Sequence, residues 1–204
     1  MITLHHLNQS RSKRIIWLLE ELNLEYKIAP YQRDNVTFLA PPELKSVHPL
    51  GKSPVIEDKG LVIAESGAIT EYLIQRYGPH LAPKADSDDY VDYLQWLHFA
   101  ESSAALPLLL KMFVAKDGAQ TNFLAGYADL ELDKVMSYVN QRLDGKRYLV
   151  ADTLTGADIM MSFIVEILTK FGLLERYPNI ATYAKQLATH DKFNKAEQLE
   201  AQYG

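Results

Sequence analysis

Residues 48–70 contain side chains of types, and at spacings, suited to holding a small anion. Pro54 stands directly before a short apolar strand, and the pair Glu65-Ser66 opens a helix after a second strand. The first turn of a helix has free backbone N–H groups and the positive end of its dipole, so it favours a negative charge. Two plainer interpretations compete with this one: Ser66 only caps its helix, and Pro54 is a proline of an edge strand.

The elements that must position these residues alternate between strand and helix in the N-terminal third. The periodicity predicts helices over 12–22 and 66–77. The predicted strands cover Ile2–Leu7, Tyr26–Ala29, Ser53–Ile56 and Leu61–Ile63. The first two strands, which a helix joins, should be parallel with a right-handed crossover, and the last two antiparallel through a tight turn.

The strand signal nearly disappears after a break at residues 78–83 and a polar linker over 84–89. Helical patterns follow at 88–114, 120–143, 157–171, 180–188 and 191–202. Thr155 and Asp158 have the spacing of a capping box at the start of the most apolar helix. We therefore predict a small α/β domain at residues 1–80 and an all-helical domain at 88–204.

The composition excludes several classes of function. The chain has 204 residues, a net charge of −5 and 48% hydrophobic residues, which describes a soluble globular protein and argues against a nucleic-acid partner. It has no apolar run long enough for a membrane span and no signal peptide at its start, so we expect a cytoplasmic protein without a membrane partner. There is no cysteine, so any thiol must come from a ligand. No histidine spacing indicates a metal site, and we predict no metal.

Three segments in this order resemble the cytosolic glutathione transferases. They are Ser10-Arg11-Ser12-Lys13-Arg14 before Trp17-Leu18-Leu19-Glu20-Glu21-Leu22, the unit from Pro54 to Ser66, and Tyr148–Asp152 leading into Thr155 and Asp158. The first segment is most similar to the bacterial and fungal group that lacks a catalytic tyrosine. The resemblance implies a thioredoxin-like N-terminal domain that binds glutathione as co-substrate, a cis peptide bond before Pro54, an all-α domain for the electrophile, and a homodimer.

The chemistry that this family performs needs a thiol of lowered pKa. A thiol with a pKa near 8.5 is only a few percent thiolate at neutral pH, and the thiolate is the nucleophile. Lowering the pKa by about two units corresponds to about 2.7 kcal/mol. One charge-assisted hydrogen bond of about 1.5–3 kcal/mol and a helix N-terminus worth about 0.3–1 kcal/mol could supply it.

The hydroxyl that meets the thiol should lie at the start of the first helix. Gln9 falls at the family's serine position by ungapped alignment, and a shift of one residue brings Ser10 there. We expect Ser10 to contact the thiol, with Arg11 and Ser12 as close rivals. Arg11 could stabilise the thiolate by its charge, and Ser10 could alternatively only cap the helix.

The resemblance also assigns the other glutathione contacts. Val55, after Pro54, should pair its backbone with the cysteinyl residue, as an added strand does. Ser66 should bind the γ-glutamyl carboxylate and Glu65 the γ-glutamyl ammonium group. Lys52 is expected at the glycyl carboxylate, or else is a solvated loop lysine.

The electrophile is expected between the first strand and the helical domain. Candidate lining residues are Leu7, Asn8, Trp96, Phe99, Ser103, Leu106, Met112 and Phe113. For Trp96, Phe99 and Leu106 the helical spacing is also that of core residues. Glu101 is a candidate to reach the γ-glutamyl ammonium group of a second subunit. His5 and His6 are expected to pack in the first strand.

The predicted function is conjugation of glutathione to a hydrophobic electrophile, which is a detoxification reaction. Glutathione-dependent reduction of a disulfide or hydroperoxide is the second interpretation. It would have to use bound glutathione itself, since the chain has no cysteine. A glutathione-binding or regulatory module without catalysis is the third.

Overall fold

The computed structural model describes residues 1–118 and 120–203. It separates into two compact units. The first consists of Met1–Leu81 together with Leu187–Gly204, and the second of Ala82–Gln186. Residues 187–204, which the sequence assigned to the helical domain, belong to the first unit in the structure.

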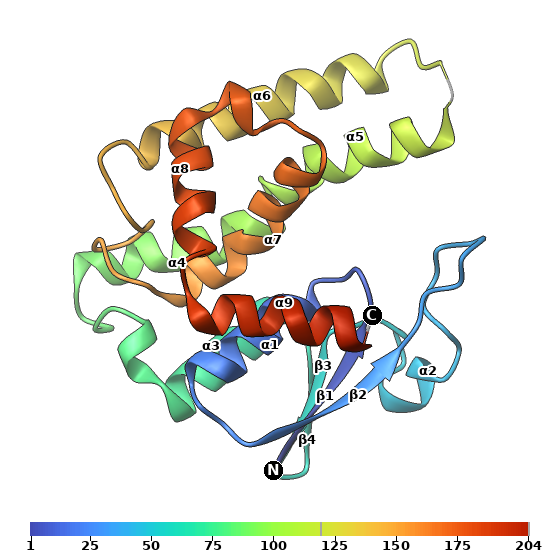
Figure 1. Ribbon diagram of the computed structural model, residues 1–204, viewed down its shortest axis with the longest axis vertical. Coiled ribbons are helices and arrows are strands. Elements are labelled where there is room, and N and C mark those ends of the chain that lie inside the picture. Colours follow the sequence, from blue (N-terminus) through green and yellow to red (C-terminus); the bar gives the residue numbers. More distant parts are fainter. Residues whose placement is uncertain (119, 204) are drawn as a thin grey trace. The chain divides into compact units, whose positions relative to one another are not determined.

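The first unit is built on a four-stranded sheet in the order β2-β1-β3-β4 (Figure 1). The strands are β1 (Ile2–Leu7), β2 (Tyr26–Tyr31), β3 (Val55–Asp58) and β4 (Leu61–Ala64). β1 and β2 are parallel and β3 and β4 are antiparallel, as predicted; the structure adds that β3 is also antiparallel to β1. The helices of this unit are α1 (Ser12–Glu21), α2 (Leu44–Val47), α3 (Ser66–Tyr77) and α9 (Asp191–Tyr203), with a 3-10 turn at Pro79–Leu81.

Helix α1 is buried over its whole circumference from residue 12 to residue 19, and not only on its apolar stripe. The reason is α9, which packs along it (Figure 1). Phe193 meets the Trp17 ring edge-on at 5.0 Å, and Lys13 Nζ lies 2.7 Å from a Glu197 carboxylate oxygen. The last helix therefore completes the core of the domain that begins with the first strand.

The second unit is all helical. Its elements are α4 (Asp88–Glu101), α5 (Ala105–Asp117), α6 (Leu124–Arg142), α7 (Gly156–Lys170) and α8 (Pro178–Leu187), with a 3-10 turn at Leu174–Arg176. α4 packs on α7 and α5 on α6. The predicted capping box is confirmed: the Thr155 hydroxyl accepts from the backbone of the first turn, and Asp158 reaches back to the Thr155 N–H at 2.9 Å. The predicted class, an α/β thioredoxin-like domain plus an all-α domain, is confirmed.

The stretch from Asp88 to Asp117 is long enough for a membrane span, and an 18-residue window within it has a mean hydropathy of 1.2. This is a weak signal, because core helices of soluble proteins pass the same test. The structure divides the stretch, which the sequence predicted as one helix, into α4 and α5. Trp96 and Leu97 of α4 are buried, so we interpret it as a core helix of the bundle.

Candidate functional site

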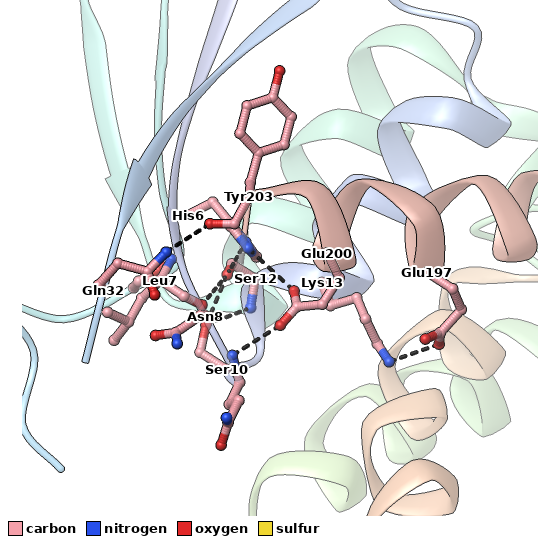
Figure 2. Close-up of polar contacts among 12 residues, drawn as sticks. His6, Leu7, Asn8, Ser10, Ser12, Lys13, Gln32, Glu197, Glu200 and Tyr203 are labelled. Atoms are coloured by element: carbon pink, nitrogen blue, oxygen red, sulfur yellow. Dashed lines mark hydrogen bonds and ion pairs between the residues drawn. The ribbon is translucent and has the colours of Figure 1, made fainter. Parts of the chain in front are cut away.

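The loop between β1 and α1 carries a chain of buried hydroxyl and imidazole groups (Figure 2). Ser10 is 7% exposed, and its Oγ accepts from the Ser12 backbone N–H at 3.1 Å. The two hydroxyl oxygens lie 2.7 Å apart, and Ser12 Oγ lies 2.7 Å from His6 Nδ1. Ser12 Oγ is also 3.2 Å from the Leu7 carbonyl oxygen. Two of the predicted catalytic residues are thus in direct contact with each other.

Helix α9 closes this chain from the other side with Glu200 (Figure 2). One carboxylate oxygen accepts from the Gln9 backbone N–H at 2.8 Å, and the other lies 3.1 Å from His6 Nε2. Burial raises the pKa of Glu200, but His6, the Gln9 N–H and Lys13 outweigh it and hold that pKa below its ordinary value. The carboxylate is therefore ionised at neutral pH and fixes the loop at Gln9, which has a positive φ of 51°.

Three arginines surround the same loop. Arg14 is buried and donates to Ser66 Oγ, which connects the start of α1 to the start of α3. Burial lowers the pKa of Arg14 and of Arg11, and Glu65 partly restores that of Arg11. Arg33 donates from Nε to the Asn8 carbonyl at 3.1 Å, and its own pKa is lowered by burial and by Arg11. This concentration of positive charge at two helix starts favours an anionic ligand.

The peptide bond between Ser53 and Pro54 is cis. Val55 is paired with His5 of β1 on one side and with Ala64 of β4 on the other, so both of its flanks are covered by strands. Ser53 extends past the last residue of β4. Its hydroxyl accepts from the Leu7 N–H at 3.1 Å and donates to the His5 carbonyl at 2.8 Å.

Helix α3 begins directly after this edge. Glu65 is exposed and has a φ of 68°, a left-handed conformation that costs energy for a residue with a side chain. Its carboxylate interacts electrostatically with Arg11. Ser66 is buried and forms the first residue of the helix. Lys52 is exposed in the loop before β3.

The structure thus brings most of the predicted residues into one unit. Ser10, Ser12, Arg11, Glu65 and Ser66 are linked through direct contacts or charge. The sequence interpretation missed other residues of the site: His6, Arg14, Arg33, Ser53 and Glu200. The helix α9 itself was predicted, and one signal could have indicated its packing face: the spacing of one helix face is shared by Phe193, Ala196, Glu197 and Glu200.

The second unit contains a cavity of about 890 Å³ between α4, α5 and α6. Its lining residues are Phe99, Glu101, Ser102, Ser103, Leu106, Pro107, Tyr127, Glu131, Lys134, Val135 and Tyr138. Among the predicted electrophile contacts, Phe99, Ser103 and Leu106 line it. Trp96 is buried and stacks on Tyr138, and Leu7 and Asn8 belong to the first unit.

Within residues 1–118 and 120–203, no group of three acidic or histidine side chains has the arrangement of a metal site.

Comparison with known proteins places this geometry in a family. The model of the glutathione S-transferase N-terminal domain matches residues 1–75, and that of the C-terminal domain matches 91–197. Glutathione S-transferase 1 of Saccharomyces cerevisiae is 35% identical over 95% of this chain and 92% of its own. Glutathione S-transferase 3 of Schizosaccharomyces pombe is 33% identical over 91% and 82%. A crystal structure of a glutathione S-transferase from Actinobacillus pleuropneumoniae superposes with a TM-score of 0.89, at 38% identity over 98% of this chain and 93% of that one. The chain therefore belongs to the glutathione S-transferase family.

Proposed function

We propose that the protein is a glutathione transferase of the group without a catalytic tyrosine, in which Ser10 stabilises the glutathione thiolate. The observation that carries the proposal is the buried Ser10 hydroxyl just before α1, beside Arg11, which interacts electrostatically with Glu65 at the start of α3. The loop from Asn8 to Ser12 contains no tyrosine. A hydroxyl hydrogen bond to a thiolate is worth about 1.5–3 kcal/mol, or about one to two pKa units.

The tripeptide would lie along the edge formed by Ser53, Pro54 and the start of α3. The free N–H groups at Ser66 suit the γ-glutamyl carboxylate, and the exposed Glu65 suits the γ-glutamyl ammonium group. Lys52 would meet the glycyl carboxylate. Strands cover both flanks of Val55, so we assign the main-chain pairing with the cysteinyl residue to Ser53, which lies beyond the end of β4, and not to Val55.

The electrophile and the second subunit belong to the same proposal. The cavity of the second unit offers Phe99, Tyr127, Tyr138 and Leu106 to an aromatic or apolar compound. Glu101 lines the same cavity and would face the γ-glutamyl ammonium group of a second copy. Tyr127 and Tyr138 are exposed, which supports a homodimer through this surface. The proposed setting is a cytoplasmic detoxification reaction.

The test is an ultraviolet titration of thiolate absorbance for glutathione bound to the protein. We expect a bound thiol pKa well below that of free glutathione, and Ser10→Ala should raise it by about one to two units. Conjugation activity should fall by about tenfold or more. Ser137→Ala, at an exposed serine of α6, is the control and should change neither quantity. An unchanged thiol pKa in Ser10→Ala would refute the role of Ser10.

One observation favours the binding module as a second candidate. The Ser10 hydroxyl already lies 2.7 Å from Ser12 Oγ, and a hydroxyl has only one proton to donate. Glutathione binding without a lowered thiol pKa would support this candidate. Turnover of a glutathione-linked disulfide or of an organic hydroperoxide, without turnover of an aryl halide, would support the reductase instead.

A further inference from the structure

The contacts around His6 form one continuous chain from α9 to the β1–α1 loop. Its members in order are Glu200, His6, Ser12 and Ser10, with separations of 3.1, 2.7 and 2.7 Å. His6 is completely buried, and Glu200 is 18% exposed. His6 Nε2 and the facing Glu200 oxygen have no aligned hydrogen-bond partner in the described part of the chain. The 3.1 Å contact between them is therefore an ion pair when His6 is protonated.

The direction of the chain follows from which atoms can donate. A carboxylate only accepts, so the Nε2 that faces it must carry a proton. If His6 is neutral, its Nδ1 is then an acceptor and must receive the Ser12 hydroxyl proton. Ser12 then has no proton left for its short contact with Ser10, so the Ser10 hydroxyl must donate its own proton to Ser12 Oγ. In this state Ser10 has no proton left to donate to a ligand.

The imidazolium form of His6 reverses this direction. Its Nδ1–H donates to Ser12 Oγ, and the Ser12 proton is then available to Ser10 Oγ or to the Leu7 carbonyl. When the Ser12 proton turns to Ser10 Oγ, the short contact between the two hydroxyls no longer requires the Ser10 proton, and this proton is released. A hydroxyl that can turn its proton outward is what a thiolate needs.

Titratable groups on the neighbouring elements surround the pair of His6 and Glu200. α9 supplies Glu200 and also Glu197, which pairs with Lys13 of α1. Arg33 follows β2 and interacts with Glu200. On the other strands, Tyr31 and Glu57 contact His5. Glu200 is the acidic group that the structure places in direct contact with the His6 ring.

We propose that Glu200 and His6 are positioning residues that keep His6 cationic and thereby leave the Ser10 hydroxyl free to donate to a thiolate. The identity of the ligand in this proposal rests on the proposed function, whereas the protonation state of His6 does not. The C-terminal helix would thus control the donor at the start of the first helix without touching the ligand.

The state of His6 is measured on the protein without ligand, by nitrogen NMR of its imidazole ring across neutral pH. The signals are assigned by their loss in His6→Gln. We expect both ring nitrogens to be protonated in the wild type at pH values where Glu200→Gln has lost the Nδ1 proton. Glu197→Gln, which changes the carboxylate one turn away that pairs with Lys13, should leave the signals unchanged. Identical His6 titrations in wild type and Glu200→Gln would overturn the proposal.

The consequence for the ligand is measured with glutathione and S-methylglutathione. Glu200→Gln should reduce the thiolate fraction of bound glutathione about tenfold, which is about one pKa unit. Affinity for S-methylglutathione, which has no thiolate, should stay unchanged, and Glu200→Gln should add nothing to Ser10→Ala. Equal loss of affinity for both compounds would indicate a merely structural role and refute the proposal.

Two further outcomes are distinguished by the design. If the wild type binds neither compound, the proposed function fails, and the NMR titration alone decides the state of His6. If Glu200→Gln detaches α9, seen as a change in Trp17 fluorescence, His6→Gln carries the same test. It keeps an amide facing Glu200 but has no cationic form, so it should reduce the thiolate fraction equally, and an unchanged fraction would refute the proposal.

Discussion

The buried polar cluster around Asp158 in the second unit and the one around His6 in the first unit are satisfied to different degrees. In the second unit the Asp158 carboxylate accepts four hydrogen bonds: from the Leu149 and Thr155 backbones, the Thr155 hydroxyl and the Tyr183 hydroxyl, at 2.8–3.1 Å. In the first unit, the contact between His6 Nε2 and Glu200 lacks hydrogen-bond alignment, and the chain of contacts ends at Ser10, which is 7% exposed.

The difference teaches how to distinguish a polar cluster that stabilises the fold from one that serves a ligand. A carboxylate whose lone pairs are all used has nothing to offer a ligand, and its donors are within nine residues except for Tyr183. The His6 cluster joins residues that are far apart in sequence and lies beside three arginines. We therefore expect mutations to affect mainly stability in the first case and mainly ligand chemistry in the second.

The largest expected effect is at Asp158. Asp158→Ala leaves two buried backbone N–H groups and the Tyr183 hydroxyl without their acceptor, at about 1–3 kcal/mol each, so the free energy of unfolding should fall by about 4 kcal/mol. The two tryptophans report separately on the units. Urea unfolding followed at Trp96, in a Trp17→Phe background, measures the effect, with Thr155→Ser as the conservative control. A decrease in the free energy of unfolding of less than about 1 kcal/mol would mean that the hydrogen bonds of Asp158 do not stabilise α7.

Acid should affect the two clusters in opposite directions. Burial raises the pKa of Asp158 despite its four donors. The stability that arises from this pKa difference is therefore complete below the pKa of the unfolded state, and it is lost as pH rises through the pKa of the folded state. The pKa of Glu200 is lowered on folding. The stability that arises from this difference is therefore complete above the pKa of the unfolded state, and it is lost as pH falls through the pKa of the folded state.

The measurement compares each unit's unfolding between about pH 6 and pH 3.5, in the range where carboxyl groups titrate. Compared with Glu200→Gln, the wild-type free energy of unfolding reported by Trp17 should fall in acid, because the pKa of Glu200 is lowered on folding. Compared with Asp158→Asn, the wild-type free energy of unfolding reported by Trp96 should rise in acid. Slopes of the same sign in the two comparisons would contradict the contrast between the clusters.

The smallest effect is expected at the ion pair between Lys13 and Glu197. Glu197 is 44% exposed, so screening reduces the value of the pair, and Glu197→Gln should cost less than about 1 kcal/mol at Trp17. The thiol pKa of bound glutathione should not change. A change in that pKa as large as the one in Glu200→Gln would mean that α9 acts through its general packing and not through one carboxylate.

Local patterns predicted the fold well, because strand, helix and cap signals act over a few residues. The capping box at Thr155 and the helix at Ser66–Tyr77 are examples. The site was predicted only in part. Ser10 and Ser12 follow from their place at a helix start, but the contact of Glu200 with Gln9 spans 191 residues of sequence. No local pattern carries such a contact, and His6 in a buried strand reads as a packing residue until its partner is known.

The place of α9 in the first unit has a consequence for how the protein is made. The chain leaves the first unit after Leu81 and returns to it at Leu187, so the second unit is an insertion within the first. At about 5–20 residues per second, synthesis from Leu81 to Glu200 takes roughly 6 to 24 s. During that time the chain on the ribosome contains a first unit in which α9 does not yet cover α1 and Glu200 does not yet face His6. The second unit can fold in this interval, whereas the contacts of the candidate site form only after α9 has been synthesised.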